Sequence, residues 1–452
     1  MSRAPKRKDR GRRATPDFPI QITKLSHEGR GLVRWGERML FVDGALPGEL
    51  VQVKITQKSS KVAEGVAVSI HRPSPDRQTP SCPHAAQCGG CSLQHMPHAH
   101  QLAHKDATFN ELFAKEGIDL SKSQRLPTLV GPVTGYRRRA RLGVRAVKAK
   151  GRVLVGFREK ASNFIADIEG CEVLDPRIGA SLNRLCKVIE GHSMPDRIPQ
   201  IEVAAGDDTL AIVVRHLEPL TDADQALWEE LGGETGWHVY LQPKGPDTVH
   251  RIWPVHGVDR LTYRLGEFGL EYRFAVTDFT QINAHINRQM LVQAIELLDL
   301  KGTESVLDLF CGLGNFTLAV ATRAAHVTGV EVSPTMIDRL SENAAHNGLS
   351  NVEGVAFDLT QPIEDQAFAQ AQYDTLIVDP PRSGAKEVLE ALPLKRIDRV
   401  LYVSCNPATL ARDAAILINR GFRLTHAGLM DMFPHTAHVE SMALFVKGNA
   451  RG

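Results

Sequence analysis

The C-terminal part of the chain alternates short apolar runs with helix-like segments, and this alternation restricts the possible folds more than any other feature. An amphipathic helix is expected over residues 284–299. Beyond it, the expected strands cover 305–310, 327–331, 352–357, 376–379 and 400–404. The helices expected between them cover 315–323, 334–346, 385–391 and 407–419. This order predicts a parallel, doubly wound α/β sheet. A last apolar run, 442–446, follows a long loop instead of a helix and could therefore enter the sheet differently.

The regions before this sheet have a different character. Residues 17–72 place short apolar strands between glycine and proline turns, which predicts a small β-barrel. Residues 125–275 mix strand and helix patterns without a clear period. The predicted organisation has four parts: a disordered basic tail over 1–16, a barrel domain over 17–75, a mixed α+β central domain over 76–275 and the α/β domain over 276–452.

Positive charge is concentrated in two short segments, although the formal net charge is only +2. The first 13 residues carry seven Lys or Arg and one acidic residue. In a second basic segment, Arg137, Arg139 and Arg141 would share one face of a strand. Local basic density of this kind attracts a polyanion. The alternatives are a solubilising tail for the first segment and a solvated strand face for the second.

The composition also suggests a cellular compartment. The chain contains no apolar run of about 18 residues, the length that a membrane-spanning helix needs. Its N-terminus lacks the apolar core of a secretory signal. We therefore expect a cytoplasmic protein, whose seven cysteines are reduced thiols, metal ligands or catalysts instead of disulfides.

Two reactive side chains follow neighbouring apolar runs near the C-terminus. Asp379 opens the segment Asp-Pro-Pro-Arg that ends at Arg382, and Cys405 lies in the segment Val-Ser-Cys-Asn-Pro. Both runs are typical of buried parallel strands, and in an open α/β sheet ligands bind beyond the carboxyl ends of the strands. The pattern therefore predicts a thiol and a carboxylate at one edge. The alternative is that Cys405 is a small buried apolar side chain.

A glycine-containing turn and three acidic residues mark the ends of the first three strands of the α/β domain. The turn spans 308–317 and has glycines at 312 and 314, which allow a ligand to approach the backbone closely. Asp308, Glu331 and Asp358 each end a strand. Glu331 can accept the ribose hydroxyls of an adenosine, and Asp358 can reach an adenine amine. The alternative is that these acids cap the following helices.

A cysteine cluster lies between the expected barrel and the central domain. Cys82, Cys88 and Cys91 are spaced C-x5-C-x2-C, and Cys171 is a candidate fourth ligand. Four thiolates suit a tetrahedral zinc ion or a 4Fe-4S cluster, and the spacing does not distinguish the two. Five nearby histidines are rival ligands: His84, His95, His98, His100 and His104. Cys186 and Cys311 are interpreted as buried, non-catalytic thiols.

Several motifs together resemble those of one enzyme family. The turn with Glu331 and Asp358 is similar to the cofactor site of S-adenosylmethionine-dependent methyltransferases. The motifs around it resemble the RNA uracil-C5 methyltransferases: Phe279-Thr280-Gln281-Ile282-Asn283, Asp379-Pro380-Pro381-Arg382, Ser404-Cys405-Asn406-Pro407 and His438-Val439-Glu440-Ser441. Residues 17–72 are similar to the TRAM domain of that family, an OB-like RNA-binding barrel. Arg382 stands where enzymes that methylate exocyclic amines have an aromatic residue, which favours a ring-carbon target.

The resemblance implies a fold, a reaction and a set of residues. It implies a Rossmann-like methyltransferase domain that methylates uracil C5 of a single-stranded or looped uridine in 23S rRNA, in a monomer. Cys405 would be the nucleophile and Glu440 the base, with a 4Fe-4S cluster on Cys82, Cys88, Cys91 and Cys171. The residues implied to bind S-adenosylmethionine are Gln281, Phe310, Asn315, Glu331, Asp358 and Asp379, and Asp379 could also contact uracil. The alternatives are another 23S rRNA or tRNA uridine, and a non-catalytic iron–sulfur RNA-binding protein.

Overall fold

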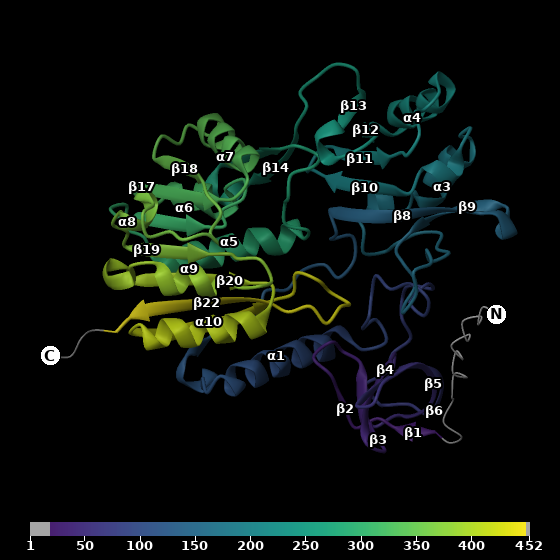
Figure 1. Ribbon diagram of the computed structural model, residues 1–452, viewed down its shortest axis with the longest axis horizontal. Helices are drawn as coiled ribbons and strands as arrows, with labels where there is room; N and C mark the ends of the chain where they lie inside the picture. Colours follow the sequence, from purple (N-terminus) through teal and green to yellow (C-terminus); the bar gives the residue numbers. More distant parts are fainter. Residues whose placement is uncertain (1–18, 449–452) are drawn as a thin grey trace, which may run out of the picture. The chain divides into compact units, whose positions relative to one another are not determined.

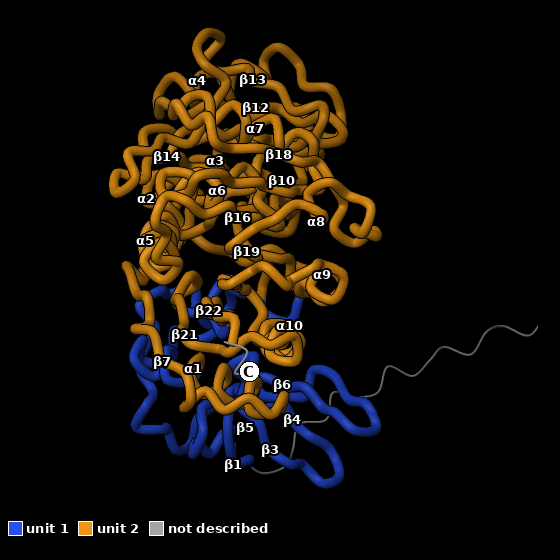
Figure 2. The backbone as a smooth tube through the Cα atoms, turned by 90° about the vertical axis from the view of Figure 1, so that its left-hand side faces the viewer, with its two compact units in different colours: residues 1–104, 160–162, 435–437 blue, residues 105–159, 163–434, 438–452 orange. Residues whose placement is uncertain are grey.

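The structure is a computed structural model that describes residues 19–448 of the chain. Backbone contacts divide it into two compact units (Figure 2). Unit 1 comprises residues up to 104 with the short segments 160–162 and 435–437, and unit 2 comprises the rest. The basic tail expected over 1–16 lies outside the described residues, and the four-part organisation stays a prediction. Within residues 19–448, none of the helices combines the length and apolar character needed to cross a membrane.

Unit 1 contains a six-stranded sheet with its own core. The strands are β1 (Ile20–Gln21), β2 (Lys24–Leu25), β3 (Gly31–Trp35), β4 (Arg38–Asp43), β5 (Leu50–Lys58) and β6 (Val62–Arg72), in the order β1-β5-β6-β4-β3-β2. All pairings are antiparallel except β4 with β6. In β5, Val51, Val53 and Ile55 are buried while Lys54 is exposed, the alternation of a strand with one buried face.

The longest strand of unit 1, β6, was not expected from the sequence. Its inward positions carry small residues, Ala63 and Gly65, and therefore show no apolar alternation. A Cβ atom at Gly65 would lie 2.5 Å from Val53 and 2.9 Å from the Lys54 carbonyl oxygen. The close approach of β5 and β6 therefore requires glycine at this position.

Unit 2 contains a central sheet that precedes the α/β domain along the chain. Its strands run in the order β13-β12-β11-β10-β8-β9 (Figure 1). They are β8 (Arg139–Val147), β9 (Arg152–Gly156), β10 (Gln200–Ala205), β11 (Leu210–Arg215), β12 (His238–Gln242) and β13 (His250–Trp253). Helices α3 (Leu182–Glu190) and α4 (Asp222–Thr235) belong to the same region, and β14 (Leu261–Leu265) pairs with β15 (Leu270–Phe274) beyond it.

The main sheet of unit 2 has eight strands in the order β18-β17-β16-β19-β20-β22-β21-β7. Figure 1 labels β18, β17, β19, β20 and β22 of this sheet. The parallel part consists of β16 (Ser305–Leu309), β17 (His326–Glu331), β18 (Val352–Ala356), β19 (Thr375–Val378) and β20 (Arg399–Ser404). Its helices are α5 (Ala284–Leu298), α6 (Asn315–Ala321), α7 (Pro334–His346), α9 (Lys386–Ala391) and α10 (Pro407–Asn419). The predicted parallel, doubly wound arrangement is thus confirmed for this part of the sheet.

Both faces of the main sheet are buried, which explains the continuous apolar runs. Leu401 and Val403 belong to a core cluster that includes residues of α5, α6 and α7. Val400 and Tyr402, the alternate residues of the same strand, belong to a second cluster with α9 and α10. A strand with apolar neighbours on both sides needs apolar residues at successive positions.

The C-terminal end of the chain departs from the expected parallel order. Strand β22 (Glu440–Lys447) is antiparallel and inserts between β20 and β21. Strand β21 (Phe422–Met430) was not expected at all, because its first half contains the polar residues Arg423, Thr425 and His426. The short strand β7 (Gln124–Arg125) pairs with it in parallel at the edge of the sheet.

A candidate active site at the carboxyl edge of the main sheet

The glycine-containing turn joins β16 to α6 in a conformation that L-residues rarely adopt. Phe310, Gly312 and Gly314 have φ angles of 64°, 55° and 96°. A Cβ atom at Gly314 would lie 2.4 Å from Leu340, whereas one at Gly312 would meet nothing within 4 Å. The turn is therefore packed against α7 at Gly314 and open at Gly312. Holding the non-glycine Phe310 at positive φ costs about 1 kcal/mol or more.

Two of the predicted cofactor-binding acids accept hydrogen bonds from backbone amides near them. The Glu331 carboxylate accepts from the backbone N–H of Gly312 at 3.2 Å and of Ser333 at 3.1 Å. The Asp358 carboxylate accepts from the backbone N–H and the hydroxyl of Thr360, and these bonds lower the pKa of Asp358. Glu331 thereby connects the turn after β16 with the end of β17. Neither acid is a helix cap, because the N-cap residues of the helices that follow, 334–346 and 367–370, are Ser333 and Gln366.

Asn315, the first residue of α6, lies in a network of polar side chains. Its amide exchanges hydrogen bonds with the Asn287 amide at 2.8 and 3.0 Å, and its Oδ1 accepts from the Tyr263 hydroxyl at 3.2 Å. The Tyr272 hydroxyl donates to the Asn315 backbone carbonyl at 3.2 Å. Gln281 is half-buried in the loop before α5. The network orients Asn315, and only Asn315 among its members was predicted as a site residue.

The carboxyl ends of β16 and β19 carry two acids with altered pKa values. Burial raises the pKa of Asp308 to about 7, although a 2.6 Å hydrogen bond from the Thr317 hydroxyl lowers it. Burial also raises the pKa of Asp379 to about 7. Asp308 Oδ1 is buried and has no hydrogen-bond partner, which fits a protonated carboxyl.

The strand register brings the predicted nucleophile and base to adjacent positions. Ser404, the last residue of β20, pairs with Ser441 of β22 across an antiparallel ladder. Cys405 follows Ser404 and Glu440 precedes Ser441, so the thiol and the carboxylate lie on neighbouring strands at the same edge. Glu440 is also among the groups that raise the pKa of Cys405.

The ionisable groups at this edge are mostly acidic, and their pKa values are raised. Burial raises the pKa of Cys405, and Glu440 and Asp379 raise it further. Burial and Asp379 together raise the pKa of Glu440 to about 8. Arg382 lowers both pKa values. Its Nη2 lies 3.3 Å from Nδ1 of His438. Arg382 is therefore the described group that most favours the thiolate form of Cys405.

One buried charge at this edge was missed by the sequence interpretation. Lys105 lies on α1 (His98–Lys115), and its Nζ forms a 2.6 Å ion pair with Asp431, directly beyond β21. Lys105 also lowers the pKa of Glu440. A lysine that falls on the apolar face of an amphipathic helix is the only sequence signal that could have indicated it.

The predicted metal ligands are divided between the two units. Cys82, Cys88 and Cys91 belong to unit 1 and all act electrostatically on Lys160, whose pKa is lowered by burial and raised by these thiols and Asp43. Cys171 belongs to unit 2. Within the part of the chain that the structure describes, no three His, Cys, Asp or Glu side chains are arranged to hold a metal ion.

The two cysteines interpreted as buried differ from each other. Cys311 is buried, as expected, and burial raises its pKa well above the usual value. Cys186 is only partly buried, so that prediction was wrong for this residue. Its side chain lines a cavity of about 350 Å³ beside α3, together with Asn183 and Lys187 of the same helix.

The arginine segment is less free than its sequence suggested. Arg139 donates to the Val276 carbonyl at 2.9 Å, and burial lowers its pKa. Arg141 is exposed and forms a 2.9 Å ion pair with Glu202. Arg139 and Arg141 share the less buried face of β8, as expected, whereas Arg137 lies before this strand. Arg141 is the better candidate of the two for contact with a polyanion.

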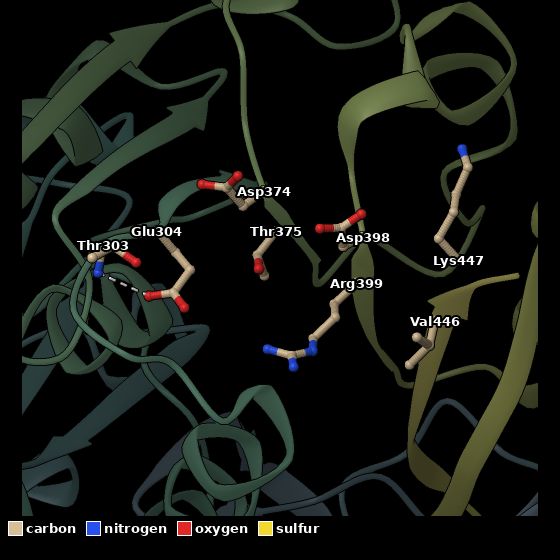
Figure 3. Close-up of a pocket in the computed structure, with 8 residues that line it drawn as sticks. All are labelled: Thr303, Glu304, Asp374, Thr375, Asp398, Arg399, Val446 and Lys447. Atoms are coloured by element: carbon tan, nitrogen blue, oxygen red, sulfur yellow. Dashed lines mark hydrogen bonds between the residues drawn. The ribbon is translucent and has the colours of Figure 1, made fainter. Parts of the chain in front are cut away.

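A second polar cavity, of about 540 Å³, lies at the opposite edge of the main sheet (Figure 3). Its lining residues come from the amino ends of β19 and β20, from the residues before β16 and from the end of β22. The Glu304 carboxylate accepts from the backbone N–H groups of Lys301, Gly302 and Thr303, and Arg399 donates to the Leu298 carbonyl. The lining residues lie at the amino ends of the parallel strands. The cavity is therefore separate from the candidate active site at their carboxyl ends.

Comparisons with known proteins agree with this arrangement. Residues 98–448 match the family described as tRNA (Uracil-5-)-methyltransferase, and residues 17–68 match the TRAM domain. The 23S rRNA (uracil(1939)-C(5))-methyltransferase RlmD of Alcanivorax borkumensis is 51% identical over 96% of this chain and 97% of its own length. The RlmD of Hahella chejuensis is 47% identical over 97% of this chain and 99% of its own.

A solved structure has a similar fold. The Pyrococcus abyssi tRNA (uracil-54, C5)-methyltransferase in complex with S-adenosyl-L-homocysteine superposes with a TM-score of 0.74 at 23% identity, over 95% of this chain and all of that one. The family matches and the fold agree over nearly the whole length. The chain therefore belongs to the RNA uracil-C5 methyltransferase family and carries an N-terminal TRAM domain.

Proposed function

We propose that this chain transfers a methyl group from S-adenosylmethionine to uracil C5 of 23S rRNA, at the position equivalent to uridine 1939. The names of the RlmD relatives, which are about half identical over nearly the full length, support this substrate. The observation that carries the proposal is the placement of Cys405 and Glu440 on adjacent strands at the edge where the glycine turn also lies. An edge with a thiol, a base and a glycine turn that is open at Gly312 suits methylation of a pyrimidine carbon.

The residues of the glycine turn fit the methyl donor. The space above Gly312 is open, and Glu331 is half-buried beside it with lone pairs left over after its two backbone bonds. Gln281, Phe310, Asn315, Asp358 and Asp379 complete the proposed cofactor site. When bound there, S-adenosylmethionine supplies an electrophilic methyl group.

Cys405 makes the target carbon reactive. Uracil C5 is a poor nucleophile, so the Cys405 thiolate first adds to C6, and the π electrons of the C5–C6 bond move to form an enolate. C5 then attacks the methyl carbon, and the bond from that carbon to the donor sulfur breaks. Glu440 removes the C5 proton, the C5–C6 double bond forms again, and the Cys405 thiolate leaves C6.

The charges at the edge support this order of events. Because Glu440 and Cys405 repel each other as anions, a protonated Glu440 favours the thiolate that starts the reaction. After addition and methyl transfer, Cys405 is a neutral thioether. Its negative charge no longer opposes ionisation of Glu440, which can then act as the base. Arg382 stabilises whichever of the two groups is charged.

The cysteine cluster has a separate proposed role. We propose that Cys82, Cys88, Cys91 and Cys171 hold a 4Fe-4S cluster that stabilises the protein or positions RNA. Cys82, Cys88 and Cys91 all act electrostatically on one cationic group, Lys160, which supports their closeness to it in unit 1. Anaerobically purified protein should contain iron and sulfide. Stoichiometric zinc without iron would contradict this part of the proposal.

The test of the reaction uses RNA with 5-fluorouridine at the target position. Fluorine cannot leave as a proton does, so wild-type protein should form a stable covalent complex with this RNA. The Cys405→Ala variant should form none, with Cys311→Ala as the matched control. Trapping by Cys405→Ala would show that another nucleophile acts. Mapping of 5-methyluridine in RNA from cells that lack this protein distinguishes the 23S rRNA target from a tRNA target.

A further inference from the structure

A buried ion pair lies beside the proposed base. The Lys105 and Asp431 side chains are 3% and 1% exposed, and their charged atoms are 2.6 Å apart. The Lys105 ammonium donates a second hydrogen bond, of 3.1 Å, to the Phe433 carbonyl. Fixing a lysine in this way removes its ammonium from water, and burial accordingly lowers the pKa of Lys105 while Asp431 raises it.

The strand register connects this pair with Glu440. Met430, the last residue of β21, pairs with Glu440, the first residue of β22. Asp431 follows Met430 directly, and its backbone N–H donates to the Leu129 carbonyl at 2.8 Å. Lys105 therefore holds the chain at the point where β21 ends, across the ladder from Glu440.

The ammonium also contributes to the charge around Glu440. Several charged or titratable groups act on Glu440 or face it. They come from α1, from the loops after β19, β20 and β21, and from the loop before β22. They are Lys105, Asp379, Arg382, Cys405, Asp431 and His438. Of the groups that act on Glu440, two are cationic: Arg382, which is exposed, and Lys105, which is buried. Of these two cations, Lys105 is the buried one, and its ammonium is fixed by Asp431 and the Phe433 carbonyl.

We propose that Lys105 is a positioning residue for Glu440, because its ammonium is fixed by Asp431 and Phe433 and stabilises the carboxylate form that removes the C5 proton. This inference rests on the proposed role of Glu440 as the base. It assigns the pair a function in catalysis beyond holding α1 to the sheet. A role confined to folding would change the stability of the protein and leave the pH dependence of proton removal unchanged.

The test measures product release from the methylated covalent adduct in single turnovers between pH 6 and pH 9. Release needs the Glu440 carboxylate, so its rate should rise with pH and then level off. In Lys105→Met the midpoint of this rise should move upward by roughly one pH unit, because an opposite charge near a carboxyl typically shifts it by that much. Lys105→Arg should restore most of the wild-type midpoint.

A second variant covers the case in which Lys105→Met leaves Asp431 unpaired and the protein does not fold. Replacing both partners, as Lys105→Met with Asp431→Leu, substitutes apolar groups for the pair and is usually tolerated. The double variant should also show an upward shift, although a smaller one, because loss of the Asp431 carboxylate favours ionisation of Glu440. Lys115→Met removes an exposed lysine of the same helix, paired with Glu111, and should leave the midpoint unchanged.

The outcomes separate the two proposals. Folded Lys105 variants with a wild-type midpoint would overturn the positioning role of Lys105 and leave Glu440 as the base. If Glu440→Gln released product at the wild-type rate, the base itself would be wrongly assigned. A shift in the Lys105 variants together with slow release by Glu440→Gln supports both.

Discussion

The two halves of the main sheet differ in how their functional residues are held. In the parallel half, β16 to β18, the proposed cofactor residues follow successive strands along the chain, and Glu331 and Asp358 accept hydrogen bonds from backbone amides. In the half formed by β20, β22 and β21, Cys405 and Glu440 come together only through antiparallel pairing. The proposed functional residues of the first half therefore lie in neighbouring segments of the chain. Those of the second half are brought together by pairing between strands. The proposed methyl donor would bind in the first half, and the proposed covalent chemistry takes place in the second.

The largest expected difference concerns one cysteine from each half. Cys405→Ala should lower turnover by on the order of 10⁴-fold or more, since it removes the nucleophile itself. Cys311→Ala, in the turn of the cofactor half, should retain activity within about tenfold, because its thiol is buried. Single-turnover methylation assays with both variants measure this contrast. Equal losses in the two would remove the distinction between the halves.

Backbone geometry should matter most in the cofactor half. Gly314→Ala places a Cβ 2.4 Å from Leu340 at a φ of 96°, so we expect a loss of about 2 kcal/mol in the free energy of unfolding and weaker binding of S-adenosylhomocysteine. Gly348→Ala is the matched control, because Gly348 also has a positive φ but open space around it, and should cost about 1 kcal/mol. Urea denaturation and calorimetric titration give the two quantities. Similar losses in both variants would mean that the packing against α7 is unimportant.

The acids at the strand ends make stability depend on pH. The folded protein raises the pKa of Asp308 to about 7, so between about pH 4 and pH 7 it binds more protons than the unfolded chain. This contribution to stability is therefore present at low pH and is lost as pH rises through about 7. Asp308→Asn should flatten the fall in unfolding free energy over this range, by up to about 1.4 kcal/mol per pH unit. An unchanged pH dependence in urea denaturation would show that Asp308 is ionised in the folded protein.

The smallest expected effect concerns RNA affinity. Arg141→Ala should flatten the slope of log affinity against log salt by about 0.7, the value for one phosphate contact with single-stranded RNA. Arg139→Met should change stability more than this slope, because Arg139 is bonded to the Val276 carbonyl. Filter-binding titrations over a range of salt concentrations measure both. A wild-type slope in Arg141→Ala would mean that Glu202 keeps this arginine from the RNA.

The same contrast explains what the sequence could and could not predict. Helices α7 and α10 were predicted with their observed bounds, because Pro334 and Pro407 mark their first turns and apolar periodicity marks their lengths. Strand β21 was missed, since its polar first half is a strand only because β22 and β7 pair with it. The role of Glu440 followed from family resemblance and not from a local pattern.

The ion pair of Lys105 illustrates the limit most clearly. Its two partners are 326 positions apart along the chain, so no window of sequence contains both. By contrast, Glu331 and the turn that it contacts are separated by 19 positions and belong to consecutive strands. Short-range sequence patterns therefore predicted the strands and helices of the first half well, whereas the charge balance of the second half required the tertiary structure.

The most direct test of the account is the mass of the complex between Glu440→Gln and RNA that carries a normal uridine at the target position. If Cys405 adds to C6 and Glu440 then removes the C5 proton, this variant should accumulate an adduct that is joined through Cys405 and already contains the transferred methyl group. Adduct without the methyl group would place Glu440 before methyl transfer. Rapid release of 5-methyluridine with no adduct would contradict the proposed division of work between Cys405 and Glu440.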